Sequence, residues 1–195
     1  MTDSVQQPNQ GRVDLSRFSA GDFDRGASRL KEALWILVRT LFFEWLPGRW
    51  YGPRRALLRA FGAKIGKGVV VKPGVRILFP WKLTVGDNCW IGEGSWLLNL
   101  AEITLEDNVA LAQRVFLATG NHDYNSPTFD LMNKPIRVCR GAWLTSGTYV
   151  GPGVTVGEHA VLGLGAVATK DLEPYGVYRG NPAEKVAVRR IRGGA

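Results

Sequence analysis

The chain has 195 residues, of which 45% are hydrophobic and 22% are charged, and its formal net charge is +8. This composition is ordinary for one compact globular domain with a short appendage. The two cysteines, Cys89 and Cys139, exclude a disulfide framework and show no metal-ligand spacing. The basic balance favours an anionic partner, but it does not choose between nucleic acid, a membrane surface and a phosphorylated ligand.

The first part of the chain divides into a polar lead-in, residues 1–27, and a helical segment, residues 28–62. The lead-in is predicted to be extended or partly disordered, and it has no apolar core typical of a signal peptide. Ser28 is the predicted N-cap of a helix that runs to Leu46. Apolar residues then recur three and four apart, which is typical of one helix face: Leu30, Leu34, Leu37, Leu41 and Trp45. A second short helix is predicted from 53 to 61, ending at Gly62.

The apolar stretch 33–46 is interrupted by Arg39 and Glu44 and is too short to span a bilayer. An amphipathic helix of this kind should dock either on the rest of the protein or, as a peripheral contact, on a membrane surface. We favour docking on the protein, because surplus apolar area normally joins the core. We therefore expect a cytoplasmic protein, with the inner face of the membrane as the alternative location.

From residue 63 onward the hydrophobic period is six, which fits neither an α-helix nor a single strand. Fourteen aliphatic residues follow this period in three registers: Ile65, Val71, Ile77, Val85, Ile91, Leu97, Ile103, Val109, Val115, Val138, Leu144, Val150, Val156 and Leu162. Glycine often comes next, and we expect it to let the chain turn. The pattern predicts an all-β domain over 63–195. Short strands wind into about five triangular coils, whose stacking creates the core.

Two interruptions and the tail depart from the period of six. Residues 78–84 are predicted to form a small bulge at a corner, and residues 120–137 a larger protruding loop in which polar side chains gather. A loop that leaves a rigid stack is a common place for a site. The tail, residues 183–192, is predicted to form a short basic helix that caps the last coil.

Of the two histidines, His159 lies inside a regular repeat and is expected to be structural, whereas His122 lies in the protruding loop. The position of His122 alone leaves a structural and a functional role open. A neutral imidazole can take a proton from a hydroxyl at neutral pH, and that hydroxyl can then attack an acyl carbonyl. Direct acyl transfer of this kind needs no nucleophilic serine.

Three stretches are far more specific than the repeat itself: ATGNHDYNSPTFDLMNKPIRV, GAWLTSGTYVGPGVTVGEHAVLGLGAVATKDL and YRGNPAEKV. Through them residues 62–188 resemble the hexapeptide-repeat acyltransferases, more closely the maltose, galactoside and nodulation sugar O-acetyltransferases and the colanic acid branch. The resemblance implies a left-handed parallel β-helix, acetyl-CoA as co-substrate, and a homotrimer with active sites between subunits. It also implies a sugar or lipid-linked glycan as acceptor, in exopolysaccharide or surface-glycan biosynthesis.

Carried over by residue, the resemblance makes His122 the catalytic base, and the adjacent Asp123 could orient its imidazole, although a backbone carbonyl does so in some relatives. The positions that match coenzyme A contacts are Trp143, Ser146, Leu164, Thr169, Lys170, Lys185 and Arg189. At Leu164 the contact would be through the backbone, and the last two lie near basic residues that meet the phosphates. The candidate acceptor contacts are Asn99, Asn121 and Tyr124.

Other functions remain as alternatives. A zinc carbonic anhydrase on the same repeat needs three histidine ligands, and the chain has two, so no metal is expected. A non-catalytic trimeric scaffold is disfavoured by the intact stretches around His122 and Lys170. Nucleic-acid binding is disfavoured because aromatic and basic residues do not interleave on a known module. A xenobiotic O-acetyltransferase, acting on antibiotics, remains the rival within the enzyme class.

Overall fold

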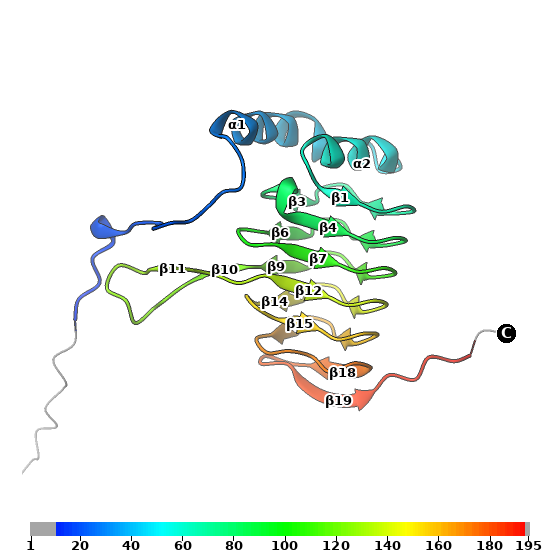
Figure 1. Ribbon diagram of the computed structural model, residues 1–195. Coiled ribbons are helices and arrows are strands. Elements are labelled where there is room, and N and C mark those ends of the chain that lie inside the picture. The colour runs from blue at the N-terminus through cyan, green and yellow to red at the C-terminus, as the bar shows by residue number, and fades with distance from the viewer. Residues whose placement is uncertain (1–10, 194–195) are drawn as a thin grey trace, which may run out of the picture.

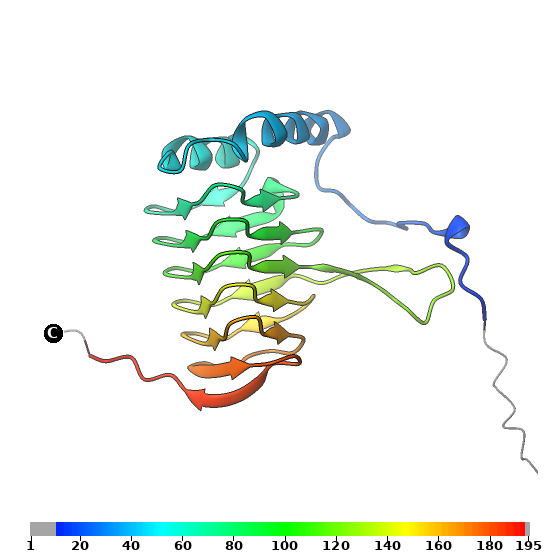
Figure 2. The same ribbon diagram turned by 180° about the vertical axis from the view of Figure 1, so that it is seen from behind.

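The computed structural model describes residues 11–193, and these residues form a stack of flat triangular coils (Figure 1). Two helices lie across the N-terminal end of the stack, and a hairpin projects from one side of it. Seen from behind, the lead-in descends from the helices toward the tip of that hairpin (Figure 2). In the described part of the chain, no helix is long and apolar enough to cross a membrane.

Three parallel sheets form the walls of the stack. The first contains β1 (Lys64–Ile65), β4 (Leu83–Val85), β7 (Ile103–Leu105), β12 (Ile136–Val138) and β15 (Thr155–Val156). The second contains β2 (Val70–Val71), β5 (Trp90–Ile91), β8 (Ala110–Leu111), β13 (Trp143–Leu144), β16 (Val161–Leu162), β18 (Gly176–Arg179) and the antiparallel β19 (Glu184–Val188). The third contains β3 (Arg76–Ile77), β6 (Trp96–Leu98), β9 (Phe116–Ala118), β14 (Tyr149–Val150) and β17 (Val167–Ala168). The three sheets give five complete coils, and β18 begins a sixth.

The predicted core is confirmed, because all fourteen aliphatic positions are buried with at most 9% of their surface exposed. The predicted register was wrong in one coil. Leu105, not Ile103, stacks on Val85, so the chain slips by two residues a second time after Leu97. Ile103 and Leu105, the first and last residues of β7, both point inward, since side chains two apart share a face of a strand. The sequence therefore fits either register.

The glycines that follow the aliphatic residues were expected to let the chain turn. They instead allow the backbones of successive coils to approach closely. A Cβ added to Gly86 would lie 2.7 Å from the backbone nitrogen of Asp107 in the next coil, so no larger residue fits there. The turns come two residues later in the repeat, in the left-handed region. Gly68 occupies it with φ of 66°, and Asn88 occupies the equivalent corner of the next coil with φ of 56°.

The outward rows of the three sheets differ in character. In the first sheet the paired outward residues are mostly polar: Lys64, Thr84, Thr104, Arg137 and Thr155. In the second sheet they are apolar: Val70, Trp90, Ala110, Trp143, Val161 and Val177. In the third sheet four of the five are apolar: Arg76, Trp96, Phe116, Tyr149 and Val167. Two walls of the stack thus present apolar rows to the outside.

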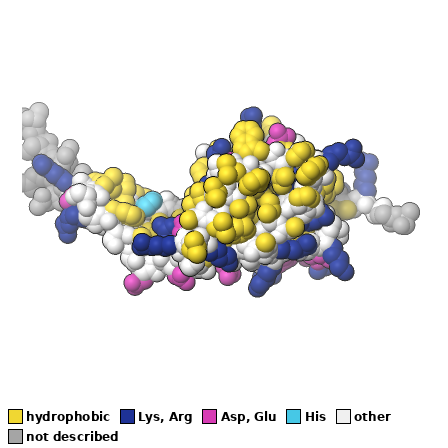
Figure 3. Space-filling model, turned by 90° about the horizontal axis from the view of Figure 1, so that it is seen from above, with side chains coloured by type: hydrophobic (Ala, Val, Ile, Leu, Met, Phe, Trp, Pro, Cys, Tyr) yellow, Lys and Arg dark blue, Asp and Glu magenta, His cyan; other side chains and the backbone are white. Residues whose placement is uncertain are grey.

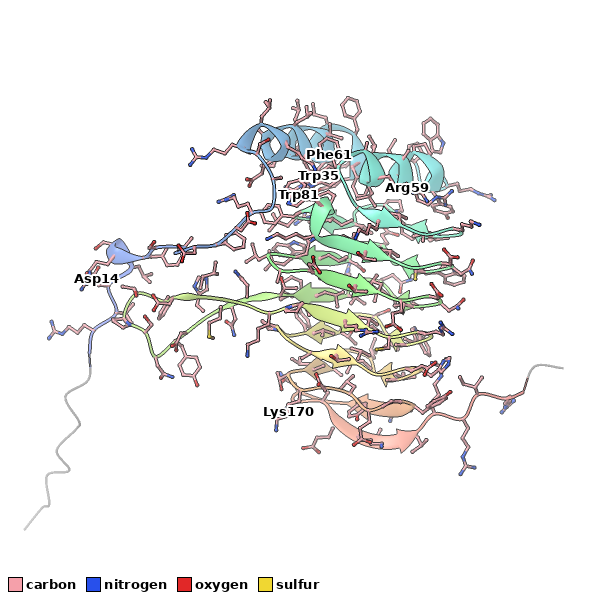
Figure 4. The ribbon with its side chains drawn as sticks, viewed as in Figure 1. Asp14, Trp35, Arg59, Phe61, Trp81 and Lys170 are labelled. Atoms are coloured by element: carbon pink, nitrogen blue, oxygen red, sulfur yellow. The ribbon has the colours of Figure 1, made fainter. Side chains whose placement is uncertain are left out.

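The helical cap comprises α1 (Arg29–Val38), its π-helical continuation η2 (Arg39–Phe43) and α2 (Tyr51–Ala60). Ser28 caps α1 as predicted, since its side chain accepts a hydrogen bond from the Lys31 N–H. The cap is fixed to the first coil by Trp35, which is fully buried and donates its indole N–H to the Ile77 carbonyl at 3.0 Å. The Trp35 ring packs on Phe61 with centroids 5.0 Å apart (Figure 4).

The predicted docking of the cap on the protein is confirmed, but the predicted face was wrong. Trp35 and Phe43 face the coils, whereas the row chosen from the sequence is exposed: Leu30, Leu34, Leu37, Leu41 and Trp45. The cap is apolar on both sides, so the period of the helix alone could not decide which side is buried.

The predicted C-terminal helix was also wrong. Residues 184–188 form β19, which pairs antiparallel with β18 at the end of the second sheet. The end coil of a stack leaves unpaired backbone groups, and an added strand satisfies them. The bulge at 78–84 is confirmed and contains the 3-10 turn η3 (Pro80–Lys82).

Candidate active site

The loop that interrupts the repeat is a hairpin between β9 and β12. Its arms are β10 (Gly120–His122) and β11 (Leu131–Asn133), which pair antiparallel with His122 opposite Leu131. The hairpin extends well beyond the wall of the stack (Figure 1). His122 lies at the outer end of β10, at the point where pairing stops and the tip begins.

The His122 imidazole is held in one orientation by the hairpin itself. Its Nδ1 lies 2.7 Å from the carbonyl oxygen of Phe129, in the tip just before β11. A carbonyl oxygen only accepts hydrogen bonds, so Nδ1 of the neutral ring carries the proton. The Nε2 lone pair is then free to accept a proton from a bound hydroxyl. Sequence reasoning could not find the Phe129 contribution, because it comes from a backbone atom.

The orienting role considered for Asp123 is not what the structure shows. The Asp123 carboxylate accepts a hydrogen bond from the Asn125 N–H at 2.9 Å, which stabilises the tip. Asn121 likewise turns back on the backbone and accepts from the His122 N–H at 2.8 Å. Tyr124 is 80% exposed at the tip and remains available to a ligand. Adjacent side chains of an extended strand point to opposite sides, so Asp123 does not reach the imidazole.

The lead-in packs along the hairpin, which the sequence did not predict. The Asp14 N–H donates to the Pro127 carbonyl at 2.8 Å, and the Phe18 ring meets the His122 imidazole edge-on with centroids 5.7 Å apart. Further along, residues 19–23 and the β11 arm line a polar hollow of about 410 Å³ that includes Asp130. Hydrogen bonds from Thr128 and Ser126 lower the pKa of the Asp130 carboxyl, which favours its charged form.

A groove on the outside of the second sheet brings together three of the predicted coenzyme A positions. Trp143, Ser146 and Leu164 line a hollow of about 550 Å³. The Ser146 hydroxyl donates to the Gln113 side-chain oxygen at 2.8 Å. Leu164 is 80% exposed, and Gly163 beside it exposes backbone. Gln113 and Arg179 also line this groove, and sequence reasoning missed both.

The remaining positions lie elsewhere. Thr169 lines a separate hollow of about 240 Å³ together with Asn121 at the base of the hairpin. Lys170 is exposed beside it at the edge of the stack and points away from the coils (Figure 4). Within residues 11–193 of one chain, therefore, the groove at Trp143 and the hollow at Asn121 are separate.

Lys185 and Arg189 are engaged within the chain. Lys185 forms an ion pair with Glu173, whose hydrogen bond raises the pKa of the lysine ammonium. Arg189 donates to the carbonyls of Gly141 and His159 at 2.9 and 3.1 Å, which fixes the tail to the stack. Both side chains are thus held by contacts within the chain.

Asn99 corrects another expectation. It is fully buried, accepts hydrogen bonds from the backbone N–H groups of Leu78 and Phe79, and donates to the Phe79 carbonyl at 2.6 Å. A side chain in that position supports the bulge and cannot meet an acceptor. The sequence could not distinguish these roles, because a polar residue in a repeat can point either way.

Known proteins with this architecture identify the family. The chain is 42% identical over 176 residues to the colanic acid biosynthesis acetyltransferase WcaF of Escherichia coli, covering 90% of this chain and 97% of that protein. The chain belongs to the hexapeptide-repeat acetyltransferases. Its fold matches that of a maltose O-acetyltransferase from Clostridium difficile 630 with a TM-score of 0.76, at 26% identity over 83% of this chain and 88% of that one. No family model matches the chain.

A further solved structure shows the same fold at lower identity. The hexapeptide-repeat acetyltransferase VCA0836 of Vibrio cholerae, complexed with acetyl coenzyme A, has a TM-score of 0.77 and 22% identity, over 89% of this chain and 96% of that one. The predictions of a left-handed β-helix and of an acetyltransferase are confirmed. The roles of individual residues in this acetyltransferase stay predictions.

Proposed function

We propose that this acetyltransferase moves an acetyl group from acetyl-CoA to a sugar hydroxyl during assembly of a surface glycan, with His122 as the general base. The observation that carries the proposal is the imidazole geometry. The Phe129 carbonyl fixes the proton on Nδ1, which leaves Nε2 as a lone-pair acceptor at the exposed end of the hairpin. A structural histidine needs no free acceptor, whereas a general base does.

The proposed reaction is a direct acetyl transfer through one tetrahedral intermediate. His122 Nε2 takes the proton of the sugar hydroxyl while its oxygen bonds to the thioester carbonyl carbon. The tetrahedral intermediate then collapses, the carbon–sulfur bond breaks, and the imidazolium returns the proton to the leaving thiolate. The products are the acetyl ester and free coenzyme A. General-base assistance of this kind contributes about 10²–10⁴-fold to the rate.

The site requires more than one copy of the chain. His122 stands on a hairpin that projects away from the stack, and the groove at Trp143 lies on a wall that does not contain the hairpin. The second and third sheets carry apolar outward rows, with Trp90 63% exposed and Tyr149 50% exposed. Exposed apolar rows of this extent are typical of interfaces. We therefore place the hairpin of one subunit beside the Trp143 groove of its neighbour in a homotrimer.

Coenzyme A is assigned to this intersubunit groove. Trp143, 45% exposed, offers an aromatic surface to the pantetheine arm, and Ser146 offers a hydroxyl already oriented by Gln113. Lys170 is the strongest candidate for a phosphate contact, because it is exposed near the hairpin base. Lys185 would first have to leave Glu173, and Arg189 its two carbonyls, so they contribute less.

The sugar acceptor follows from two supports of different kinds. The relatives named above include a maltose O-acetyltransferase and an acetyltransferase of colanic acid biosynthesis, a polysaccharide. The hairpin and the lead-in supply polar groups, among them Tyr124, Asp130 and Asn133, that suit an acceptor with several hydroxyls. Acetyl-CoA use fits the cytoplasm as the place of action.

The test is an acceptor panel with release of coenzyme A as the readout. Free sugars, nucleotide sugars and lipid-linked oligosaccharides would be compared with chloramphenicol and streptogramin hydroxyls, with the His122→Ala variant as the blank. We expect turnover on a glycan acceptor. Turnover confined to the antibiotics would reassign the protein as a xenobiotic acetyltransferase, and no turnover on any acceptor would favour the non-catalytic scaffold.

A further inference from the structure

The outer side of the helical cap is an apolar surface with no covering element in the described chain. We define the cap face as the exposed apolar side chains of α1, η2 and the turn after it: Leu30, Leu34, Leu37, Leu41, Phe42 and Trp45. Each is at least half exposed, and Leu30 and Trp45 are 79% and 78% exposed. Viewed from above, these hydrophobic side chains form one continuous area (Figure 3).

The cap does not need this face for its own folding. The opposite side of the same helices already holds the core contacts of Trp35 and Phe43, whose rings lie 5.4 Å apart. A single amphipathic helix with one buried side normally presents polar residues to water on the other. The second apolar side is therefore exposed apolar surface that the packing of the cap on the coils does not use. A continuous exposed apolar patch of this kind indicates a binding partner.

The charge around the cap face selects the partner. Residues 25–59 contain seven arginines and lysines that are not buried, besides the buried Arg54, and only two carboxylates, Glu32 and Glu44. Glu32 forms an ion pair with Arg25, and Glu44 forms ion pairs with Arg39 and Arg76. Both acidic groups are therefore paired. In Figure 3 dark blue side chains lie along much of the edge of the face, with magenta ones among them.

We propose that the cap face docks on an anionic phospholipid bilayer. Apolar side chains on one side of a helix, with basic residues around them, are the features that hold a helix in the plane of a membrane interface. A second copy of the chain would bring two cationic rims together, and the repulsion opposes that occupant. The inference depends on the cap alone and not on the proposed acetyl transfer.

The position of the cap adds a geometric reason. The helices lie across the end of the coil stack, perpendicular to its length (Figure 1). In a trimer of parallel stacks the three cap faces would lie on one end, where a flat surface can meet all three together. The hairpin leaves the stack after the third coil, two strand spacings or about 10 Å below the first. The helix layer adds about 10 Å, so docking would hold the base of the hairpin about 20 Å from the lipid surface.

The experiment is vesicle sedimentation of the full-length protein. Vesicles of phosphatidylcholine with phosphatidylglycerol would be compared with phosphatidylcholine alone, at low and high salt. We expect binding to the anionic vesicles, weakened by about fivefold for each basic residue screened. The Leu41→Gln/Trp45→Gln double variant should bind at least about tenfold more weakly, since each side chain loses interfacial burial.

The matched control is the Val188→Gln/Ile191→Gln double variant, whose replaced side chains are 61% and 54% exposed on the tail. It should bind vesicles like the wild type. Both variants should keep the melting temperature and the turnover of a water-soluble acceptor, which separates docking from folding and from the proposed chemistry. Failure of the wild type to bind anionic vesicles, or equal binding by the cap variant, would overturn the proposal. If light scattering showed an assembly larger than a trimer that the cap variant does not form, the cap face would bind a second copy of the chain instead of a membrane.

Discussion

Replacing His122 by alanine is the most direct perturbation of the proposed site. The side chain is exposed on the hairpin, so its removal leaves the core of the stack untouched. It deletes one hydrogen bond, to the Phe129 carbonyl, and two ring contacts, with Phe18 and Phe129, each worth about 1 kcal/mol to the local hairpin. The coils should therefore melt as in the wild type.

The rate should respond far more strongly than the fold. Loss of general-base assistance lowers kcat by about 10²–10⁴-fold, which corresponds to about 3–5.5 kcal/mol of transition-state stabilisation. The KM for acetyl-CoA should change little, because a general base lowers the barrier of the chemical step and does not hold the cofactor in the ground state. The assay is coenzyme A release at saturating acceptor.

The control for this prediction is His159→Ala. His159 is the only other histidine, and it lies at a coil corner with its ring 5.0 Å from that of Tyr175. It should retain kcat within about twofold, because surface changes away from a site have small effects. If the His122 variant keeps more than about a tenth of the wild-type kcat, His122 is not the base and the proposed step is wrong.

Three further predictions address the cofactor, the cap and the thiol. Lys170→Ala should raise the KM for acetyl-CoA about three- to tenfold in steady-state kinetics. Lys185→Ala should change this KM little, because the Lys185 side chain is already paired with Glu173. Equal effects of the two variants would contradict the assignment of Lys170 to a phosphate contact. Trp35→Ala should lower the free energy of unfolding by about 3–5 kcal/mol in denaturant titration, since its side chain is fully buried. Burial raises the pKa of Cys89 from 9.0 to about 11, so a thiol reagent should modify it only on unfolding. The contribution of the protonated Cys89 thiol to the free energy of unfolding is complete below pH 9 and is lost as the pH rises toward 11. Reaction of Cys89 with the reagent in the native state at pH 8 would contradict its burial.

The repeat domain was predictable from the sequence because its signal is redundant. Each coil repeats the same inward aliphatic pattern, so the fourteen positions predicted the core although one register was wrong by two residues. The hairpin site was partly predictable for a related reason, since His122 stands where the period breaks. The part of the site that escaped comes from the backbone carbonyl of Phe129 and from Phe18, which lies a hundred residues away in the chain.

The sequence was sufficient to predict the coils, the start of the first helix at Ser28 and the position of the protruding hairpin. These features depend on the spacing of apolar, capping and polar residues over short stretches of the chain, and that spacing can be read directly from the sequence. Three features depend on contacts between distant segments: the side of the cap that is buried, the pairing of the tail as β19, and the burial of Asn99. Those outcomes depend on what another part of the chain leaves uncovered: the end of the first coil, the edge of β18 and the backbone of the bulge. The residues next to a segment in the sequence do not show which surfaces and backbone groups elsewhere in the fold are left uncovered or unpaired.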